Sequence, residues 1–322
     1  VQSAGLFFVK EQPMSRMIND WPEKPLEPAW ITIGNFDGVH LGHQALIAEL
    51  ITHARQDKVL AVALTFWPHP RVYFTQEVEG FYLNDRTEKN ELLAKTGLDV
   101  ILCLPFNQQL ADLDTQQFLR KLNSLVPLKG LLVGENFALG KGRQGTGNVL
   151  QSVCSAMGVP CLDIPPVMLD GQVISSQRIR QTLDSGEVEQ TARLLGRPYV
   201  LTGYVAPGKH RGAKLGFPTA NLYFDIQRKL PRFGVYATFV EVDGLIYQGV
   251  TSVGIRPTFD DGRFPSVETL LLDFDADIYG KLIQVKFVKF LRDEIKYDQI
   301  EDLIDQIEQD KIDARRILDH GV

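Results

Sequence analysis

Residues 31–43 of the chain read ITIGNFDGVHLGH. The first three form a short β-branched run, and Asp37-Gly38 is a turn signal. A helical pattern begins directly afterwards, with apolar side chains at intervals of three or four at Leu46, Ile47, Leu50 and Ile51. A strand, a tight turn and a helix start present free backbone N–H groups and the positive end of a helix dipole to an anion. The stretch therefore predicts a nucleotide phosphate site within an α/β fold.

Two histidines of this stretch, His40 and His43, lie three positions apart, and Gly42 lies between them. Such a pair can bind a metal, fill a core or donate hydrogen bonds to phosphoryl oxygens. A metal site needs further ligands, but the other histidines are scattered and no HExxH motif accompanies the pair. The glycine-rich turn favours phosphate contact.

The composition is that of an ordinary globular protein. The chain has 322 residues, 44% of them apolar and 23% charged, and this length predicts two domains. The net charge of −6 argues against a general binder of nucleic acid or anionic membranes. We find no apolar stretch near the ~20 residues of a membrane span and no signal-peptide pattern, so we expect no membrane partner.

The three cysteines, Cys103, Cys154 and Cys161, lie in apolar runs without a CxxC pair. This usage indicates neither a disulfide framework nor a thiolate zinc site. It fits a reducing compartment, and we expect a cytoplasmic protein.

Strand-like and helical patterns alternate through the first two thirds of the chain. Further strands are expected at residues 59–66, 99–105, 130–134 and 160–164, and helices at 87–95, 115–125 and 148–157. Asp114 or Thr115 is the expected cap of the middle helix. Alternation of this kind predicts a parallel sheet covered by helices on both faces, with ligands at the carboxyl ends of its strands. Residues 1–29 show no functional signal, although residues 6–9 have the pattern of an edge strand.

The pattern changes near Arg197-Pro198. Residues 199–290 show short alternating runs split by Gly, Pro and Asp, which predict a small antiparallel barrel or sandwich. Residues 297–318 form an amphipathic helical pattern. We therefore expect two domains, at residues 1–198 and 199–322.

A second motif, VISSQRIR at residues 173–180, enters a helical stretch. Ser175 and Ser176 at a helix start are commonly caps, whereas the arginines Arg178 and Arg180 are suited to bind phosphate.

Together the two motifs resemble the signatures of the HxGH nucleotidyltransferases. Eight further segments resemble, in order, the bacterial bifunctional riboflavin kinase/FAD synthetase family: LTFWPHP (64–70), VGENFALGKGRQG (133–145), LGRPY (195–199), LGFPTANL (215–222), GVY (234–236), RPTF (256–259), VETLLLDF (267–274) and IYGKLIQVKFVKFLRDEIKY (278–297). The resemblance covers residues 30 to 315, roughly, and implies a Rossmann-like adenylyltransferase domain followed by a β-barrel kinase domain that ends in a helix.

The resemblance implies two reactions. The barrel would transfer the γ-phosphoryl group of ATP to riboflavin, which gives FMN. The first domain would then let the FMN phosphate attack the α-phosphorus of a second ATP, which gives FAD and pyrophosphate. Riboflavin, FMN and ATP are thus the expected partners, with Mg²⁺ accompanying ATP, while the sequence assigns no oligomeric state.

The resemblance also implies the residues of each site. In the adenylyl site, His40, His43 and Arg180 would be catalytic, and the binding residues would be Gly34, Phe36, Gly42, Phe66, Pro68, Pro70, Asn136 and Ser176. Of these, Phe66 and the two prolines would form an apolar ledge for the isoalloxazine ring. In the kinase site, Glu268 would be the general base, Thr219 and Asn221 would bind Mg²⁺ and phosphate, and Gly208 and Gly212 would bracket a phosphate loop.

Four positions depart from the family pattern. Gln177 stands in place of a hydroxyl residue, and in the barrel the usual Arg, Asn and His are replaced by Ala213, Ser252 and Leu270. We expect kinase activity that is slower or has altered affinity. Two alternatives stay open from the residues: an enzyme in which only the adenylyl half is active, and a flavin-binding regulatory or carrier protein without turnover.

Overall fold

The computed structural model describes residues 15–135, 137–207, 217–257 and 263–320. The chain divides into two compact units. The first unit comprises Val1–Gln76 and Arg86–Met168, and the second comprises Glu77–Asp85 and Leu169–Val322.

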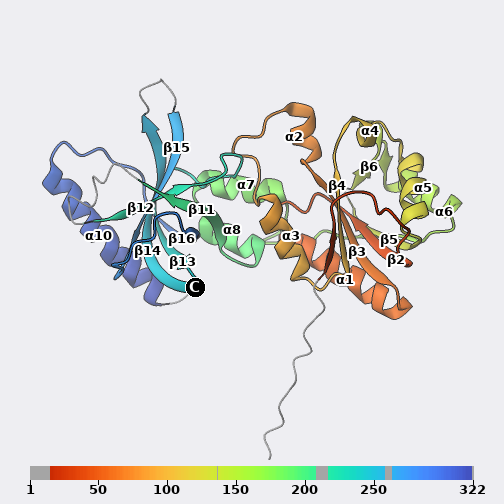
Figure 1. Cartoon of the computed structure of the whole chain (residues 1–322), viewed down its shortest axis with the longest axis horizontal. Helices are drawn as coiled ribbons and strands as arrows, with labels where there is room; N and C mark the ends of the chain where they lie inside the picture. The colour runs from red at the N-terminus through yellow and green to blue at the C-terminus, as the bar shows by residue number, and fades with distance from the viewer. Residues whose placement is uncertain (1–14, 136, 208–216, 258–262, 321–322) are drawn as a thin grey trace, which may run out of the picture. The chain divides into compact units, whose positions relative to one another are not determined.

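The first unit contains a six-stranded sheet in which all paired strands are parallel (Figure 1). Its strands lie in the order β1 (Arg16–Ile18), β4 (Val100–Pro105), β3 (Leu60–Trp67), β2 (Ala29–Ile33), β5 (Leu128–Gly134) and β8 (Cys161–Ile164). The chain runs outward from β2 in one direction through β3 and β4, and in the other through β5 and β8. The strand order therefore reverses at β2.

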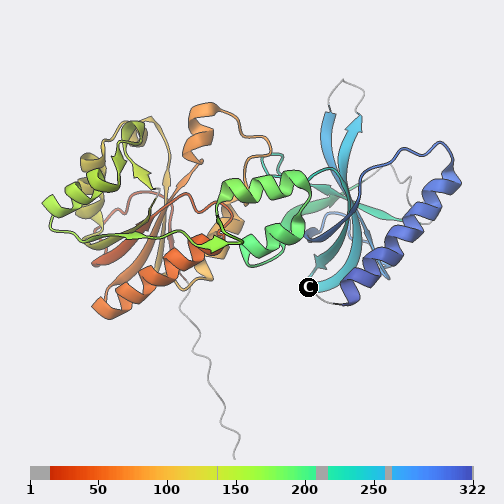
Figure 2. The same cartoon turned by 180° about the vertical axis from the view of Figure 1, so that it is seen from behind.

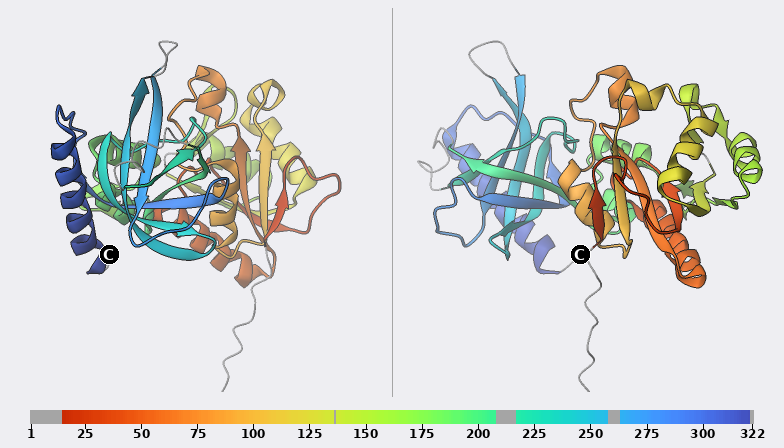
Figure 3. Two further views of the ribbon diagram at one scale, coloured as in Figure 1. Left: turned by 60° about the vertical axis from the view of Figure 1, so that its left-hand side comes forward. Right: turned by 45° about the vertical axis from the view of Figure 1, so that its right-hand side comes forward.

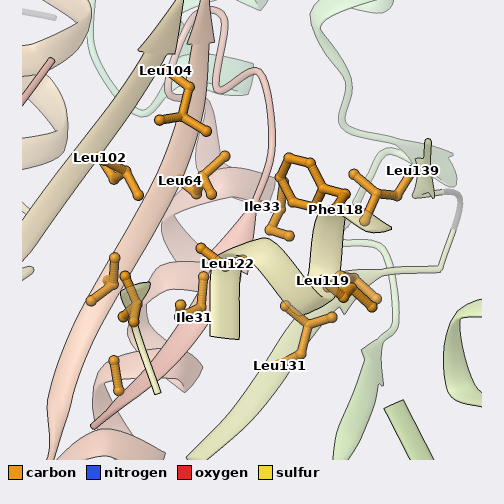
Figure 4. Packing of buried hydrophobic residues seen from close by; sticks show 14 of the residues in the cluster. Ile31, Ile33, Leu64, Leu102, Leu104, Phe118, Leu119, Leu122, Leu131 and Leu139 are labelled. Carbon is orange, nitrogen blue, oxygen red and sulfur yellow. The ribbon is translucent and has the colours of Figure 1, made fainter. Parts of the chain in front are cut away.

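Helices cover both faces of this sheet, as the sequence predicted. The long helices are α1 (Leu41–Asp57), α3 (Arg86–Ala94), α5 (Thr115–Leu125) and α6 (Gly147–Ala156). One core packs α1 and α3 against the sheet, with α1 in front of the strands in Figure 2. A second core packs α5 and α6 on the opposite face, and Figure 4 shows Phe118, Leu119 and Leu122 of α5 against Ile31, Ile33 and Leu64.

Short elements complete the first unit. They are α2 (Pro70–Thr75), α4 (Gln108–Ala111), η1 (Lys141–Arg143), β6 (Ala138–Leu139) and β7 (Gly145–Thr146). The expected cap of α5 is Asp114, whose side chain accepts from the Gln117 amide while the Gln117 side chain accepts from the Asp114 amide. This capping box explains why α5 begins at Thr115, where the sequence placed it.

The second unit is a closed six-stranded antiparallel barrel (Figure 3). Of the two folds that the sequence predicted for this region, a barrel or a sandwich, the structure therefore shows the barrel. Around the barrel the strands are β11 (Tyr199–Ala206), β12 (Thr219–Tyr223), β15 (Arg263–Leu271), β14 (Leu245–Pro257), β13 (Gly234–Val242) and β16 (Leu282–Arg292). The C-terminal helix α10 (Ile300–Asp319) packs against the barrel through Ala314 and Leu318. Before the barrel come β9 (Met168–Leu169), β10 (Gln172–Val173), α7 (Ser176–Ser185) and α8 (Val188–Leu195).

The segment Glu77–Asp85 belongs to the second unit although its sequence neighbours belong to the first. Backbone bonds join Gly80 N to Ile226 O at 3.0 Å and Lys229 N to Tyr82 O at 2.8 Å. The buried Arg228 side chain donates to Leu83 O at 3.0 Å and to Val200 O at 2.8 Å. The segment is thus bonded to the loop before β13, and through Arg228 to β11.

The expected strand at residues 6–9 lies outside the described residues. The edge position of the sheet is held by β1, which pairs with β4 through Arg16, Met17 and Ile18.

Gly130 offers a test of the packing that fixes β2 against β5. It lies directly opposite Trp30, and an added Cβ would lie 2.1 Å from the Trp30 ring. We expect Gly130→Ala to lower the free energy of unfolding of the first unit by about 1–3 kcal/mol through overpacking. Gly134→Ala on the same strand is the control, because an added Cβ there meets nothing within 4 Å. Equal chemical-denaturation midpoints for the two variants would contradict this packing role.

Candidate functional site

The turn after β2 lies where the strand order reverses, which is where open α/β sheets place their ligands. Phe36 and Val39 have φ values of 50° and 39°, and Gly38 has a φ of 85°. Non-glycine residues seldom adopt this region, so the turn needs support from its surroundings. That support includes the completely buried Phe36 ring, which occupies the space next to Gly34. An added Cβ on Gly34 would lie only 3.0 Å from this ring.

His40 forms the cap of α1. Its Nδ1 accepts a hydrogen bond from the His43 amide at 3.3 Å, and its ring stacks on the His43 ring with a centroid distance of 3.6 Å. Because Nδ1 accepts, the proton of a neutral His40 ring lies on Nε2. The sequence predicted the helix start here, and the structure shows that one of the two histidines builds it.

His43 is held as a neutral imidazole. Its pKa lies well below the ordinary 6.5, because burial disfavours the imidazolium and because His40 and Lys89 place positive charge nearby. The Nδ1 atom of His43 is buried and has no hydrogen-bond partner within the described part of the chain. A neutral ring with an unused buried nitrogen is suited to a hydrogen bond with a ligand.

The ledge at the end of β3 is only partly exposed. Phe66 has 7% of its surface exposed, and its ring packs against Phe106 and Phe118 at centroid distances of 5.7 and 6.5 Å. Pro68 and Pro70 are half-buried. The ring of Phe66 thus contributes mainly to the core, and the prolines offer the accessible surface.

The second motif lies at the start of α7, in the second unit. Ser175 caps this helix by accepting from the Arg178 amide at 3.2 Å, which is the ordinary role that the sequence allowed, and Ser176 is the first helical residue. The guanidinium of Arg180 packs over the Phe81 ring at 4.3 Å, and its Nε donates to Phe81 O at 2.9 Å. That the two motifs share one pocket stays a prediction.

The barrel brings together three of the expected kinase residues. Asn221 on β12 lies opposite Glu268 on β15, and Thr219 lies two residues earlier on the same face. Thr219 Oγ1 donates to Glu268 Oε2 at 3.4 Å, and the Asn221 amide donates to Thr219 O at 3.4 Å. Hydroxyl, amide and carboxylate oxygens are the ligands that Mg²⁺ prefers, so this donor set fits the ion. Groups of three His, Cys, Asp or Glu suited to hold a metal do not occur among the described residues.

A second carboxylate beside this set was missed by the sequence reasoning. Glu294 follows β16, and one of its oxygens lies 2.1 Å from where a Cβ of Gly254 would be. The hydroxyl of Ser252, itself paired with Glu268, donates to Glu294 at 3.4 Å. Burial raises the pKa of Glu294 above its usual range, and the charge of Glu268 adds to the effect. The missing side chain of Gly254 makes the approach possible, and this contact between distant strands has no signal in the sequence.

The residues that depart from the family pattern differ in their structural surroundings. Leu270 is buried, lies opposite Thr219 and belongs to the core between the barrel and α10, so its apolar side chain suits its place. Gln177 is exposed in the first turn of α7. Ala213 lies outside the described residues, as do the expected site residues Asn136, Gly208 and Gly212.

Family models match both parts of the chain. A model described as FAD synthetase matches residues 23–178, and one described as riboflavin kinase matches residues 195–318. A parallel sheet with a phosphate-type turn and a separate barrel define a two-domain flavin-nucleotide transferase.

Curated relatives that match most of the chain are named for both a riboflavin kinase and an FMN adenylyltransferase activity. The bifunctional riboflavin kinase/FMN adenylyltransferase of Listeria monocytogenes is 37% identical over 289 residues, which cover 88% of this chain and 91% of the relative. The protein of the same name from Escherichia coli K12 is 35% identical over 305 residues, which cover 93% and 96%. The chain belongs to the bifunctional riboflavin kinase/FMN adenylyltransferase family. It is an enzyme that phosphorylates riboflavin to FMN and adenylylates FMN to FAD, and the two alternatives without one or both activities are not favoured.

A solved structure resembles most of the chain. The crystal structure of a macrolide-efflux protein from Streptococcus pneumoniae superposes with a TM-score of 0.85 at 30% identity, covering 94% of this chain and 99% of that one. Among the described residues we find no helix with the length and apolar character needed to cross a membrane.

The low pKa of His43 can be measured directly. We expect its ring resonances in NMR to titrate well below pH 6.5. In His40→Gln the pKa of His43 should rise, because a positive charge beside it is removed. A His43 midpoint at or above 6.5 in the unaltered protein would contradict the neutral state described here.

Proposed function

We propose that the two activities are divided between residues 1–198, which carry the adenylyl transfer, and residues 199–322, which carry the kinase. The family models, which end at residue 178 and begin at residue 195, support this division. The kinase assignment rests on one observation above all, the 3.4 Å contact of Thr219 with Glu268 beside Asn221.

In the kinase reaction, a neutral primary alcohol has to lose its proton as it attacks phosphorus. Glu268 is the proposed general base that accepts the proton of the riboflavin 5′-hydroxyl. The oxygen then bonds to the γ-phosphorus of ATP, and ADP leaves. Thr219 and Asn221 would hold Mg²⁺, which supplies positive charge against the phosphate oxygens, and Gly208 and Gly212 would bracket the loop beside those phosphates.

In the adenylyl reaction, the nucleophile is the FMN phosphate, which is already an anion and needs no general base. One of its oxygens attacks the α-phosphorus of ATP, and pyrophosphate leaves. His40 and His43 are proposed to donate hydrogen bonds to the phosphate oxygens as charge builds up. Gly34 and the buried Phe36 would shape the turn that receives the phosphates, and Gly42, in the first turn of α1, would let them approach because it has no side chain.

The remaining predicted residues would complete the adenylyl site. Arg180 would approach the phosphates as a charged donor, with Ser176 at the α7 start and Asn136 as polar positioning groups. In the structure the guanidinium of Arg180 contacts Phe81, so this role requires it to exchange that contact for the nucleotide. Pro68, Pro70 and the edge of Phe66 would receive the flavin ring.

The compartment is proposed to be the cytoplasm. The small number of cysteines, Cys103, Cys154 and Cys161, and the lack of a CxxC pair support this proposal.

Glu268→Gln tests the kinase half, because it keeps the shape of the side chain but removes the base. We expect FMN formation from riboflavin and ATP to fall by roughly 10²–10⁴-fold, with FAD formation from supplied FMN unchanged. Glu241→Gln, which changes a barrel glutamate paired with Lys286, is the control. Products are separated by chromatography. Equal loss of both reactions in Glu268→Gln would contradict separate sites.

His43→Ala tests the adenylyl half. We expect FAD formation from supplied FMN to fall by about 10²–10³-fold, as when one preorganised donor to a developing charge is removed. Riboflavin phosphorylation, followed in the same protein preparation, should be unchanged and shows that the variant is folded. If His43→Ala adenylylates FMN at the unaltered rate, residues 34–43 take no part in the reaction.

A further inference from the structure

Lys89 is a buried lysine to which neither proposed mechanism assigns a role. It lies on α3, and only 4% of its surface is exposed. Its Nζ donates to Asn35 O at 3.4 Å, to Thr65 Oγ1 at 3.1 Å and to Phe66 O at 3.2 Å. These acceptors are two backbone carbonyls and a hydroxyl, and the face of the Trp67 ring lies 5.5 Å away.

The three bonds join segments that are distant in the sequence. Asn35 belongs to the turn after β2, while Thr65 and Phe66 lie at the end of β3, directly before Pro68 and Pro70. Thr65 Oγ1 itself donates to Asn35 O at 3.1 Å. The ammonium, the hydroxyl and the carbonyl therefore form a closed set of hydrogen bonds between the phosphate-type turn and the start of the ledge.

Linking the turn to the end of β3 through a buried ammonium costs free energy, because the charge has to be taken out of water. Burial disfavours the ammonium and lowers the pKa of Lys89, although Cys103 and Asp37 act in the opposite direction. A methionine would fill the same space without taking a charge out of water. A buried charge that is kept beside a ligand-binding turn indicates that the ligand makes use of it.

We propose that Lys89 is a positioning residue of the adenylyl reaction. Its ammonium holds the carbonyl of Asn35 against the end of β3, so that the turn and the ledge keep one relative position. Its positive charge also favours the anionic phosphates at the turn, and acts there more strongly than a surface charge because water is excluded around it. This inference rests on the proposed ATP site at residues 34–43.

The decisive variant is Lys89→Met, which keeps the volume and removes the charge. We expect kcat for FAD formation from FMN to fall about 10²-fold, as for a small displacement of reacting groups, with a smaller change in the KM for ATP. Riboflavin phosphorylation should be unchanged. The pKa of His43, followed by NMR, should rise, because Lys89 is one of the charges that depress it. The rise in that pKa reports the removal of the charge, whereas the fall in kcat with little change in KM reports its role in the reaction.

Three further variants separate charge from fold. Lys89→Arg keeps the charge and should recover most of the lost rate. Thr65→Val removes the hydroxyl, and should lower kcat by less than Lys89→Met while leaving the pKa of His43 unchanged. The double variant should be no slower than Lys89→Met, because both side chains act through Asn35. Lys121→Met is the matched control, since this lysine lies 4.5 Å over the Trp21 ring.

The outcomes distinguish this role from the proposed site itself. If Lys89→Met adenylylates FMN as fast as Lys121→Met while His43→Ala is slow, only the role of Lys89 is overturned. If His43→Ala is as fast as the unaltered protein, the ATP site at the turn is overturned. If Lys89→Met loses the thermal transition of the first unit, the test rests on Thr65→Val. An unaltered rate of FAD formation from FMN in that variant would overturn the proposal.

Discussion

The parallel pairing of β2 with both β3 and β5 is the constraint on which the first active site depends. Ile31 pairs with Val62 on one side and with Leu131 on the other, so β2 is fixed across its whole width. The chain leaving β2 therefore emerges between two strands whose own connections run in opposite directions. The backbone turns sharply at this point to start α1. The strained turn, the histidine cap and the buried lysine all follow from that geometry.

The barrel reaches an active site by a different physical route. Antiparallel neighbours place side chains from two strands directly opposite each other, so Asn221 and Glu268 meet through register alone. In the proposed kinase reaction a proton has to be taken from an alcohol, and the carboxylate of Glu268 lies on this face. In the adenylyl reaction proposed for the first unit the nucleophile is already charged, and the turn there offers the imidazoles of His40 and His43 instead. The two chemistries thus call for two sets of side chains, and each fold supplies one.

Local structure could be read from the sequence, and contacts between distant segments could not. Helix α5 begins where Asp114 predicts it, because the capping box lies within four residues. The Ser175 cap was one of two expected roles for the same reason. Lys89 looked like one more lysine in a helical pattern, since its acceptors at Asn35 and Thr65 lie far off in sequence. Glu294 was missed because its place depends on Gly254, a residue of another strand. Closure of the barrel likewise depends on the pairing of β11 with β16, in which Tyr199 lies opposite Phe287 and Tyr204 opposite Leu282.

The segment Glu77–Asp85 has a consequence for dividing this protein into its halves. It leaves the first unit, bonds to the loop before β13, and then returns to begin α3. A fragment that starts at residue 199 would lack the Leu83 carbonyl that the buried Arg228 contacts. It would also lack the Tyr82 backbone that bonds to Gln227 and Lys229. A fragment that stops at residue 198 would carry the segment without its partners. A gene split after residue 198 would therefore separate this segment from the loop before β13, to which its backbone is bonded.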